Sequence, residues 1–134
     1  MRNISTWVAV AVGGALGGLM RAVIDFGSLT SGTSNLWSVL LVNLVGAGLL
    51  GVAVGHGMRT WSVAFRAGIT TGFLGSFTTF SAIMTGWLSV TLKGEPLLAL
   101  AYIAATFFGG VAAAYGGAHA GEWWRDVAMP QETS

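Results

Sequence analysis

Hydrophobic residues run along this chain in four long stretches separated by short polar segments. A membrane-spanning helix needs about 20 mainly apolar residues, and stretches of that kind cover residues of about 5–24, 36–57, 62–92 and 97–121. Because similar stretches recur toward the C-terminus, we expect the first to be a retained span rather than a removable signal peptide. The pattern predicts an all-α membrane protein, with four transmembrane helices forming one domain over residues 1–134.

The stretch over residues 62–92 differs from the others because it is too long for one straight crossing. Its middle holds a polar run at residues 72–81, GFLGSFTTFS. We therefore predict a broken third helix, with the break near residues 75–80. A break frees backbone carbonyls, which need a partner inside a membrane. A cation such as Na⁺ would satisfy them, and so would ordered water.

Glycine is frequent, with 21 residues, whereas proline occurs only twice. Several glycines stand four residues apart within the apolar stretches. This spacing lets two membrane helices approach each other closely. The pairs are Gly13 with Gly17, Gly14 with Gly18, and Gly51 with Gly55. We expect them to lie at helix contacts.

Composition agrees with a membrane environment and excludes several classes of partner. Hydrophobic residues make up 54% of the chain and charged residues only 8%, whereas a soluble domain carries roughly 25% charged residues. The chain has no cysteine, which excludes disulfides and thiolate metal sites. A formal net charge of +1 gives no footprint for nucleic acid. The expected surroundings are therefore membrane lipid.

Four crossings place both termini on the same side of the membrane. The basic residues then divide into two groups, Arg2, Arg59, Arg66 and Arg125 on the side of the termini, and Arg21 and Lys93 on the other. Cytoplasmic segments carry the excess of Lys and Arg. The small difference weakly favours termini inside, and insertion in both orientations stays open.

The polar residues argue against two functional classes. All five carboxylates are expected in loops or tails, Asp25 among them. A small proton-coupled drug exporter needs a carboxylate inside the membrane to exchange protons for a cationic substrate. An enzyme needs a nucleophile with a base, or a metal cluster, and His56 and His119 stand alone near span ends. We therefore expect neither activity.

Neutral hydrogen-bond donors remain, and a line of such donors suits an anion. They are Asn43, Thr70, Thr71, Ser76, Thr78, Thr79, Ser81, Tyr102 and Thr106, with Arg21 as a cation near the end of the first span. Amides and hydroxyls donate hydrogens. The edge of an aromatic ring is positive, and Phe77 and Phe80 would offer such edges to an anion. Any single Ser or Thr can instead bond back to its own helix.

Four sequence features together resemble the Fluc (CrcB) fluoride channels. The segment Gly14-Ala-Leu-Gly-Gly-Leu-Met-Arg21 is similar to the family's glycine-rich first-helix motif, and Val42-Asn43-Leu-Val-Gly46 to its second-helix motif. The run at residues 72–81 resembles the third-helix signature. Tyr102 and Thr106 resemble the polar side of the fourth helix.

This resemblance implies passive, electrodiffusive export of fluoride through an antiparallel, dual-topology dimer in a prokaryotic cell membrane. It assigns the backbone carbonyls of Gly75 and Thr78 to a central, structural Na⁺. The fluoride pathway that it implies would be lined by Asn43, Phe80, Thr79, Ser81, Tyr102, Thr106 and Arg21.

Two positions depart from the family pattern. Ile83 stands where a second phenylalanine is usual, and Gly86 where a Glu is frequent. Ile83 cannot present a polarised ring edge, so either one edge is sufficient or the pore of this chain alone is impaired. Besides a homodimer, the sequence therefore leaves open a partial or non-conducting subunit of a heterodimer. A small multidrug-type transporter is the remaining alternative.

Overall fold

The structure is a computed structural model that describes residues 2–30, 35–58 and 61–128. Within these residues the chain is all-helical, and four helical segments are long and apolar enough to cross a membrane. This is the coarse architecture that the hydrophobic pattern predicts. Arg59, counted above among the basic residues on the side of the termini, lies outside the described residues.

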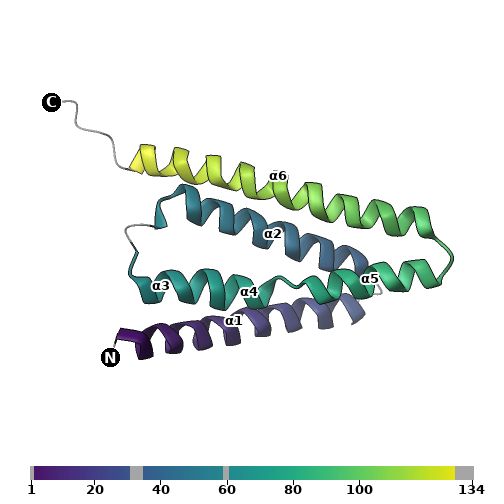
Figure 1. Cartoon of the computed structure of the whole chain (residues 1–134), viewed down its shortest axis with the longest axis horizontal. Coiled ribbons are helices and arrows are strands. Elements are labelled where there is room, and N and C mark those ends of the chain that lie inside the picture. Colours follow the sequence, from purple (N-terminus) through teal and green to yellow (C-terminus); the bar gives the residue numbers. More distant parts are fainter. Residues whose placement is uncertain (1, 31–34, 59–60, 129–134) are drawn as a thin grey trace.

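Three of the four crossings are single α-helices, and the third is a series of short helices (Figure 1). The elements are α1 (Arg2–Thr30), α2 (Asn35–Gly55), α3 (Val63–Ala67), the π-helix η2 (Gly68–Leu74), α4 (Gly75–Phe77), α5 (Phe80–Leu92) and α6 (Pro96–Ala128). We call the series α3 to α5 the third crossing. The start of α1 and the end of α6 lie at the same end of the bundle (Figure 1).

The helices pack mainly as two pairs, α2 with α6 and α1 with the third crossing. Glycines make both contacts close. Gly51 and Gly55 of α2 lie directly against the backbone of α6, and Gly13 and Gly17 of α1 lie against the backbone of η2. The predicted role of these two glycine pairs in helix contact is confirmed. Gly18, in contrast, has open space around it within this chain.

Both terminal helices extend beyond the predicted spans. The first span was expected to end at Ile24, yet α1 continues to Thr30, so Asp25 lies in a helix and not in a loop. The fourth was expected to end at Gly121, and α6 continues to Ala128. No proline interrupts either extension, and an established helix propagates easily once nucleated.

The third crossing departs from regular α-helix in two places. Its first half contains η2, a π-helix that was not expected from the sequence pattern. Further along, Thr78 and Thr79 have extended backbone, with φ and ψ of −90° and 149° and of −150° and 129°. Within the predicted interval of residues 75–80, Gly75 keeps helical angles. We call the two extended residues, Thr78 and Thr79, the interruption.

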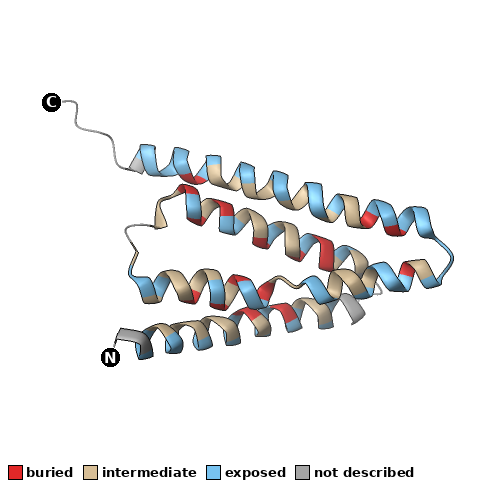
Figure 2. Cartoon of the chain, viewed as in Figure 1, coloured by how far each residue is buried: buried red, intermediate tan, exposed pale blue. Residues whose placement is uncertain are grey.

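Large apolar side chains cover much of the outer surface, and buried residues are few (Figure 2). Trp7, Phe26, Leu92 and Phe108 are each more than two-thirds exposed in the single chain. In water such a surface would aggregate or bind a partner. Against lipid it needs no cover, which agrees with four membrane-spanning helices.

The α2–α6 contact gives the first testable prediction. A methyl group at Gly51 would overlap the carbonyl oxygen of Ala114, so Gly51→Ala should lower the free energy of unfolding by about 1–3 kcal/mol. Gly116→Ala is the matched control, because nothing lies within 4 Å of that position. Unfolding of both variants in mixed micelles measures the difference. Equal stability of the two variants would contradict the packing described here.

Candidate functional site

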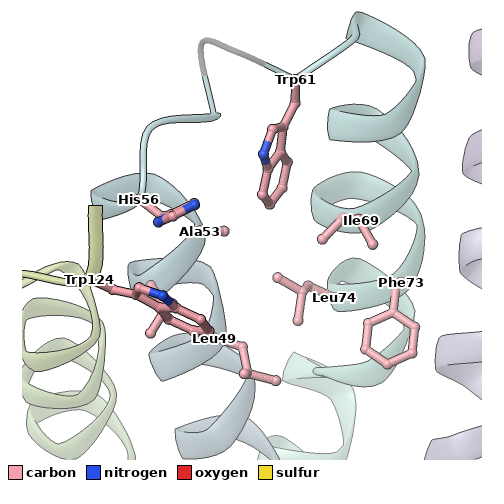
Figure 3. A pocket seen from close by; sticks show the side chains of 9 residues that line it. Leu49, Ala53, His56, Trp61, Ile69, Phe73, Leu74 and Trp124 are labelled. Atoms are coloured by element: carbon pink, nitrogen blue, oxygen red, sulfur yellow. The ribbon is translucent and has the colours of Figure 1, made fainter. Parts of the chain in front are cut away.

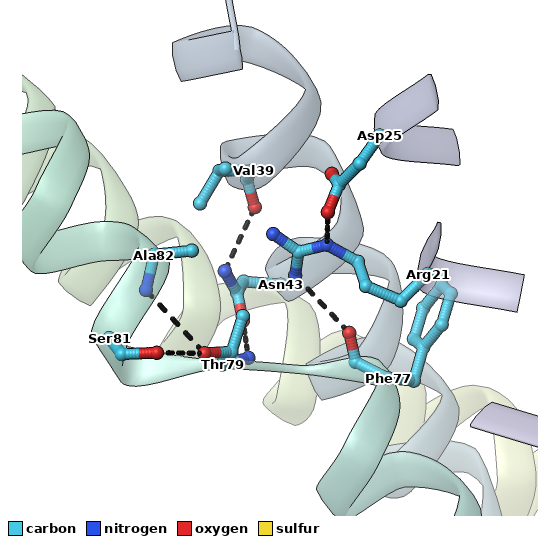
Figure 4. Close-up of polar contacts among 8 residues, drawn as sticks. All are labelled: Arg21, Asp25, Val39, Asn43, Phe77, Thr79, Ser81 and Ala82. Atoms are coloured by element: carbon cyan, nitrogen blue, oxygen red, sulfur yellow. Dashed lines mark hydrogen bonds and ion pairs between the residues drawn. The ribbon is translucent and has the colours of Figure 1, made fainter. Parts of the chain in front are cut away.

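The interruption lies where three crossings meet: a side chain from α2 bonds to its backbone, and a side chain from α1 bonds to the residue just before it (Figure 4). In a continuous α-helix each N–H donates to the carbonyl four residues earlier. Thr78 keeps such a bond, donating to Leu74 O over 3.0 Å. The N–H of Thr79 instead donates to Asn43 Oδ1, also over 3.0 Å. The carbonyl of Gly75 thereby loses its helical donor.

Asn43 connects α2 to the interruption through both ends of its amide. Its Oδ1 accepts from Thr79, and its Nδ2 donates to Val39 O over 2.9 Å. An amide nitrogen carries two hydrogens, so Nδ2 can donate to one more acceptor. Asn43 therefore holds the extended backbone and keeps one hydrogen for another group.

Arg21 approaches the interruption from α1. The residue is only 7% exposed. Its Nε donates to Asp25 Oδ2 over 2.9 Å, and its Nη1 donates to the carbonyl of Phe77 over 3.4 Å (Figure 4). Phe77 is the last residue of α4. A buried cation thus satisfies a carbonyl at the end of a helix, where carbonyls lack helical partners.

Hydroxyl groups divide into two kinds. Thr78 and Thr106 each donate to the carbonyl four residues earlier in the same crossing, over 2.8 Å in both cases. Thr79 and Ser81 instead bond to each other through their hydroxyl oxygens, 2.8 Å apart. Thr79 also accepts from the N–H of Ala82 and so caps α5. In the pair, one hydroxyl hydrogen is used and the other is free to donate.

Tyr102 of α6 has a buried hydroxyl that lies next to α5. It is 5% exposed, and its oxygen has no hydrogen-bond partner among the described residues. Gly86 of α5 is close, since a Cβ built there would lie 3.3 Å from this oxygen. A buried hydroxyl is costly to leave unpaired. The position therefore suits a bound water or an anion.

Phe77 and Phe80, the two phenylalanines singled out in the polar run, lie in different surroundings. Phe77 is 3% exposed and stacks on Phe73, with ring centroids 5.8 Å apart. Phe80 begins α5 and is 73% exposed at the surface of the single chain. Of these two rings, Phe80 is the one that another molecule or a second chain can reach.

The structure brings together only part of the residue set expected from the sequence. Asn43, Thr79 and Ser81 form one hydrogen-bonded group, and Arg21 reaches the same segment through Phe77 O. Tyr102 and Thr106 lie on α6 with no hydrogen bond to that group. Sequence reasoning missed Asp25, although it stands four residues after Arg21, the spacing of helical ion pairs.

A separate cavity of about 370 Å³ opens between α2 and the third crossing (Figure 3). Its lining residues are Leu49, Val52, Ala53, His56, Trp61, Ile69, Phe73, Leu74 and Trp124. The lining is almost wholly apolar, and His56 packs against the ring of Trp124 at 5.8 Å. This cavity offers few hydrogen-bond donors, so the surroundings of the interruption are the better candidate for binding an ion.

Most of this chain is similar in sequence to known proteins. Residues 8–118 match the family described as CrcB-like protein, Camphor Resistance (CrcB). A protein of Gloeobacter violaceus named fluoride-specific ion channel FluC is 42% identical, over 82% of this chain and 90% of its own length. Proteins of the same name from Deinococcus radiodurans and Rhizobium etli are 40% and 39% identical. They cover 83% and 81% of this chain, and 90% and 89% of their own lengths.

The bond between Asn43 and Thr79 gives the second prediction. Asn43→Leu removes the acceptor for the Thr79 N–H, so the free energy of unfolding should fall by about 1–3 kcal/mol. The amide hydrogen of Thr79 should also exchange faster with solvent deuterium. Thr85→Val is the control, because Thr85 is exposed and bonds only to its own helix. Unchanged exchange at Thr79 in the leucine variant would show that the bond does not hold the interruption.

Proposed function

This chain belongs to the CrcB-like family, and from that premise we propose that it forms a fluoride-selective channel that exports cytoplasmic fluoride by passive electrodiffusion. It is a multi-pass membrane protein and not an enzyme. Its relatives compared above are all named fluoride-specific ion channels. Export of this kind would give the cell resistance to fluoride.

The observation that carries the proposal is the group of neutral donors around the interruption. Fluoride is small and strongly hydrated, so a selective pore has to replace most of its water shell with close donors. Asn43 has one amide hydrogen to spare, and the pair of Thr79 and Ser81 has one hydroxyl hydrogen. Such donors attract an anion without trapping it as a full positive charge would.

We assign four further residues, from α1, α5 and α6, to the pathway or its surroundings. Tyr102 supplies a buried hydroxyl, and Phe80 supplies a ring edge. Thr106 donates to its own helix, so its oxygen contributes only as an acceptor or after reorientation. Arg21 stands beside the pathway and adds positive charge near its mouth.

The proposed pathway needs a second subunit. Phe80 is 73% exposed on the single chain, so its ring needs a second subunit to enclose a pathway beside it, and the carbonyls of Gly75 and Thr78 are proposed below to hold a shared cation. We place these groups at the interface of an antiparallel homodimer with dual topology. The weak bias of Lys and Arg between the two sides allows both orientations. A heterodimer with a homologous subunit is the alternative, because Ile83 supplies no second ring edge.

The carbonyls near the interruption fit a structural Na⁺. The Thr79 N–H binds Asn43 and therefore no longer donates to the carbonyl of Gly75. The carbonyl of Thr78 belongs to extended backbone. Oxygen donors of this kind suit a hard cation such as Na⁺. We propose that Gly75 and Thr78 of both subunits hold the ion, which would supply fixed positive charge at the dimer centre.

The location of Asp25 within a helix does not support a function as a proton-coupled drug exporter. Asp25 lies in α1, but it is paired with Arg21 at 2.9 Å. A proton-coupled exporter needs a carboxylate that binds protons and cationic substrate in turn. The neighbouring guanidinium repels a cationic substrate, and no observation favours that function.

Fluoride efflux from liposomes that contain only this purified chain tests the proposal. We expect rapid efflux of fluoride and no comparable efflux of chloride. Asn43→Asp should abolish the fluoride flux by placing a negative charge in the pathway, while its Oδ1 can still accept from Thr79. Asn35→Asp adds the same charge at the first residue of α2 and should keep the flux.

The possible results distinguish a selective homodimeric channel from a non-selective channel and from a heterodimer. Chloride efflux as fast as fluoride efflux would exclude selectivity, and undiminished flux in Asn43→Asp would remove Asn43 from the pathway. No flux from this chain alone, restored by a homologous subunit carrying a phenylalanine at the position of Ile83, would replace the homodimer with a heterodimer.

The proposed cation site gives a further prediction. A ligand that binds only the folded dimer raises its stability as the ligand concentration rises. Thermal unfolding of the purified protein at constant ionic strength should therefore shift to higher temperature as Na⁺ replaces N-methylglucamine. Chloride stays the counter-ion throughout, so a fluoride effect cannot contribute. A flat response to Na⁺ would exclude a sodium site that stabilises the dimer.

A further inference from the structure

Asp25 is the one carboxylate beside the interruption among the described residues, and the pathway proposed above does not use it. It stands one helical turn after Arg21 on α1, and its Oδ2 accepts from Arg21 Nε over 2.9 Å. The two side chains differ in burial, at 9% exposed for Arg21 and 41% for Asp25. The carboxylate therefore meets its cation at the edge of a buried region.

The same guanidinium carries a second contact that reaches the third crossing. Arg21 Nη1 donates to the carbonyl of Phe77 over 3.4 Å. In a continuous helix this carbonyl would accept from the N–H of Ser81. The extended conformation of Thr78 and Thr79 removes that geometry. Arg21 thus replaces a backbone donor at the point where α4 ends.

The two contacts are mechanically linked because a guanidinium is planar and rigid. A carboxylate that fixes Nε also fixes the plane of the group and the direction of Nη1. Without it, the long side chain can rotate among several conformers. The charge of Asp25 also compensates a cation that would otherwise be buried alone, which is unfavourable.

We propose that Asp25 is a positioning residue, which holds the guanidinium of Arg21 against the Phe77 carbonyl and so fixes the end of α4 beside the ion pathway. The proposal rests on the proposed function only in its effect on flux. Its structural part, control of the Phe77 contact by Asp25, stands on the geometry alone. The two parts can therefore fail separately.

A second Arg–Asp pair in the chain supplies a matched control. Arg125 Nε donates to Asp126 Oδ1 over 3.0 Å, and Arg125 Nη1 donates to the carbonyl of Gly55 over 3.4 Å. This pair lies at the end of α6, far along the bundle from the interruption (Figure 1). Asp126 is 69% exposed. The same Asp→Asn change at either site removes one carboxylate charge from an arginine pair.

A carbonyl resonance reports the Phe77 contact directly. Phe77 and Thr78 form the single Phe–Thr step in the sequence. Labelling phenylalanine with ¹³C at the carbonyl and threonine with ¹⁵N therefore selects this one peptide group in a correlation spectrum. Asp25→Asn should shift the carbonyl resonance upfield, toward its position in Arg21→Gln, because the hydrogen bond weakens. Asp126→Asn should leave it unchanged.

Fluoride efflux from liposomes tests the effect on the pathway. Asp25→Asn should lower the flux roughly tenfold, the factor that corresponds to weakening one hydrogen bond of a charged group. Asp25→Glu, which keeps the charge, should restore most of it. In an Arg21→Lys background, Asp25→Asn should have little further effect, because Asp25 acts through the guanidinium. Asp126→Asn should conduct as the unsubstituted chain does.

The outcomes separate this proposal from the proposed function. An unshifted Phe77 resonance in Asp25→Asn overturns the positioning role, and so does a raised flux, which would mean that Asp25 only weakens the attraction of anions. If the unsubstituted chain conducts no fluoride, the function fails while the resonance still tests the contact. If Asp25→Asn does not fold, Asp25→Glu decides the question. A folded Asp25→Glu chain with the resonance of Arg21→Gln would overturn the proposal.

Discussion

The need to satisfy peptide groups away from water is the constraint on which the rest of this structure depends. A polar backbone group left unpaired in hydrocarbon costs several kcal/mol, and extended residues inside a transmembrane helix release several such groups at once. Here α1 and α2 provide the partners. Arg21 donates to the carbonyl of Phe77, and Asn43 accepts from the N–H of Thr79. The interruption is thus held from two sides by side chains of opposite hydrogen-bonding character.

These side chains reach the interruption because glycines bring the helices close. Gly13 and Gly17 place α1 directly on the backbone of η2, and Gly46 leaves room for the methyl group of Thr78 against α2. Larger residues at these positions would hold the helices apart, and the amide of Asn43 is too short to span a wider gap. The glycine content of the chain therefore serves the polar site as well as helix packing.

The sequence predicts the four crossings well, because the length and apolarity of a span are imposed by the bilayer. It predicts their ends less well, since a helix continues past the predicted end of its span when nothing stops it, as α1 does at Asp25 and α6 does after Gly121. The sequence alone did not predict the hydrogen-bond partners. Asn43 was expected only as a pathway amide, and its bond to Thr79 depends on the packing of α2 against the third crossing. The Arg21–Asp25 pair did have a signal in the four-residue spacing, but assigning Asp25 to a loop concealed it.

Ile83 and Gly86, the two positions expected from the resemblance to depart from the family pattern, bear on the same polar groups. The ring of Tyr102 packs so close to Gly86 that a Cβ there would lie 3.3 to 3.4 Å from its atoms. A longer acidic side chain at this position would have to displace the tyrosine or accept a hydrogen bond from its hydroxyl. With glycine, the hydroxyl stays buried and without a partner among the described residues. Under the proposed function, the permeating anion is then the acceptor that this hydroxyl lacks. Loss of a ring edge at Ile83 and gain of a free donor at Tyr102 would therefore act in opposite directions on the same pathway.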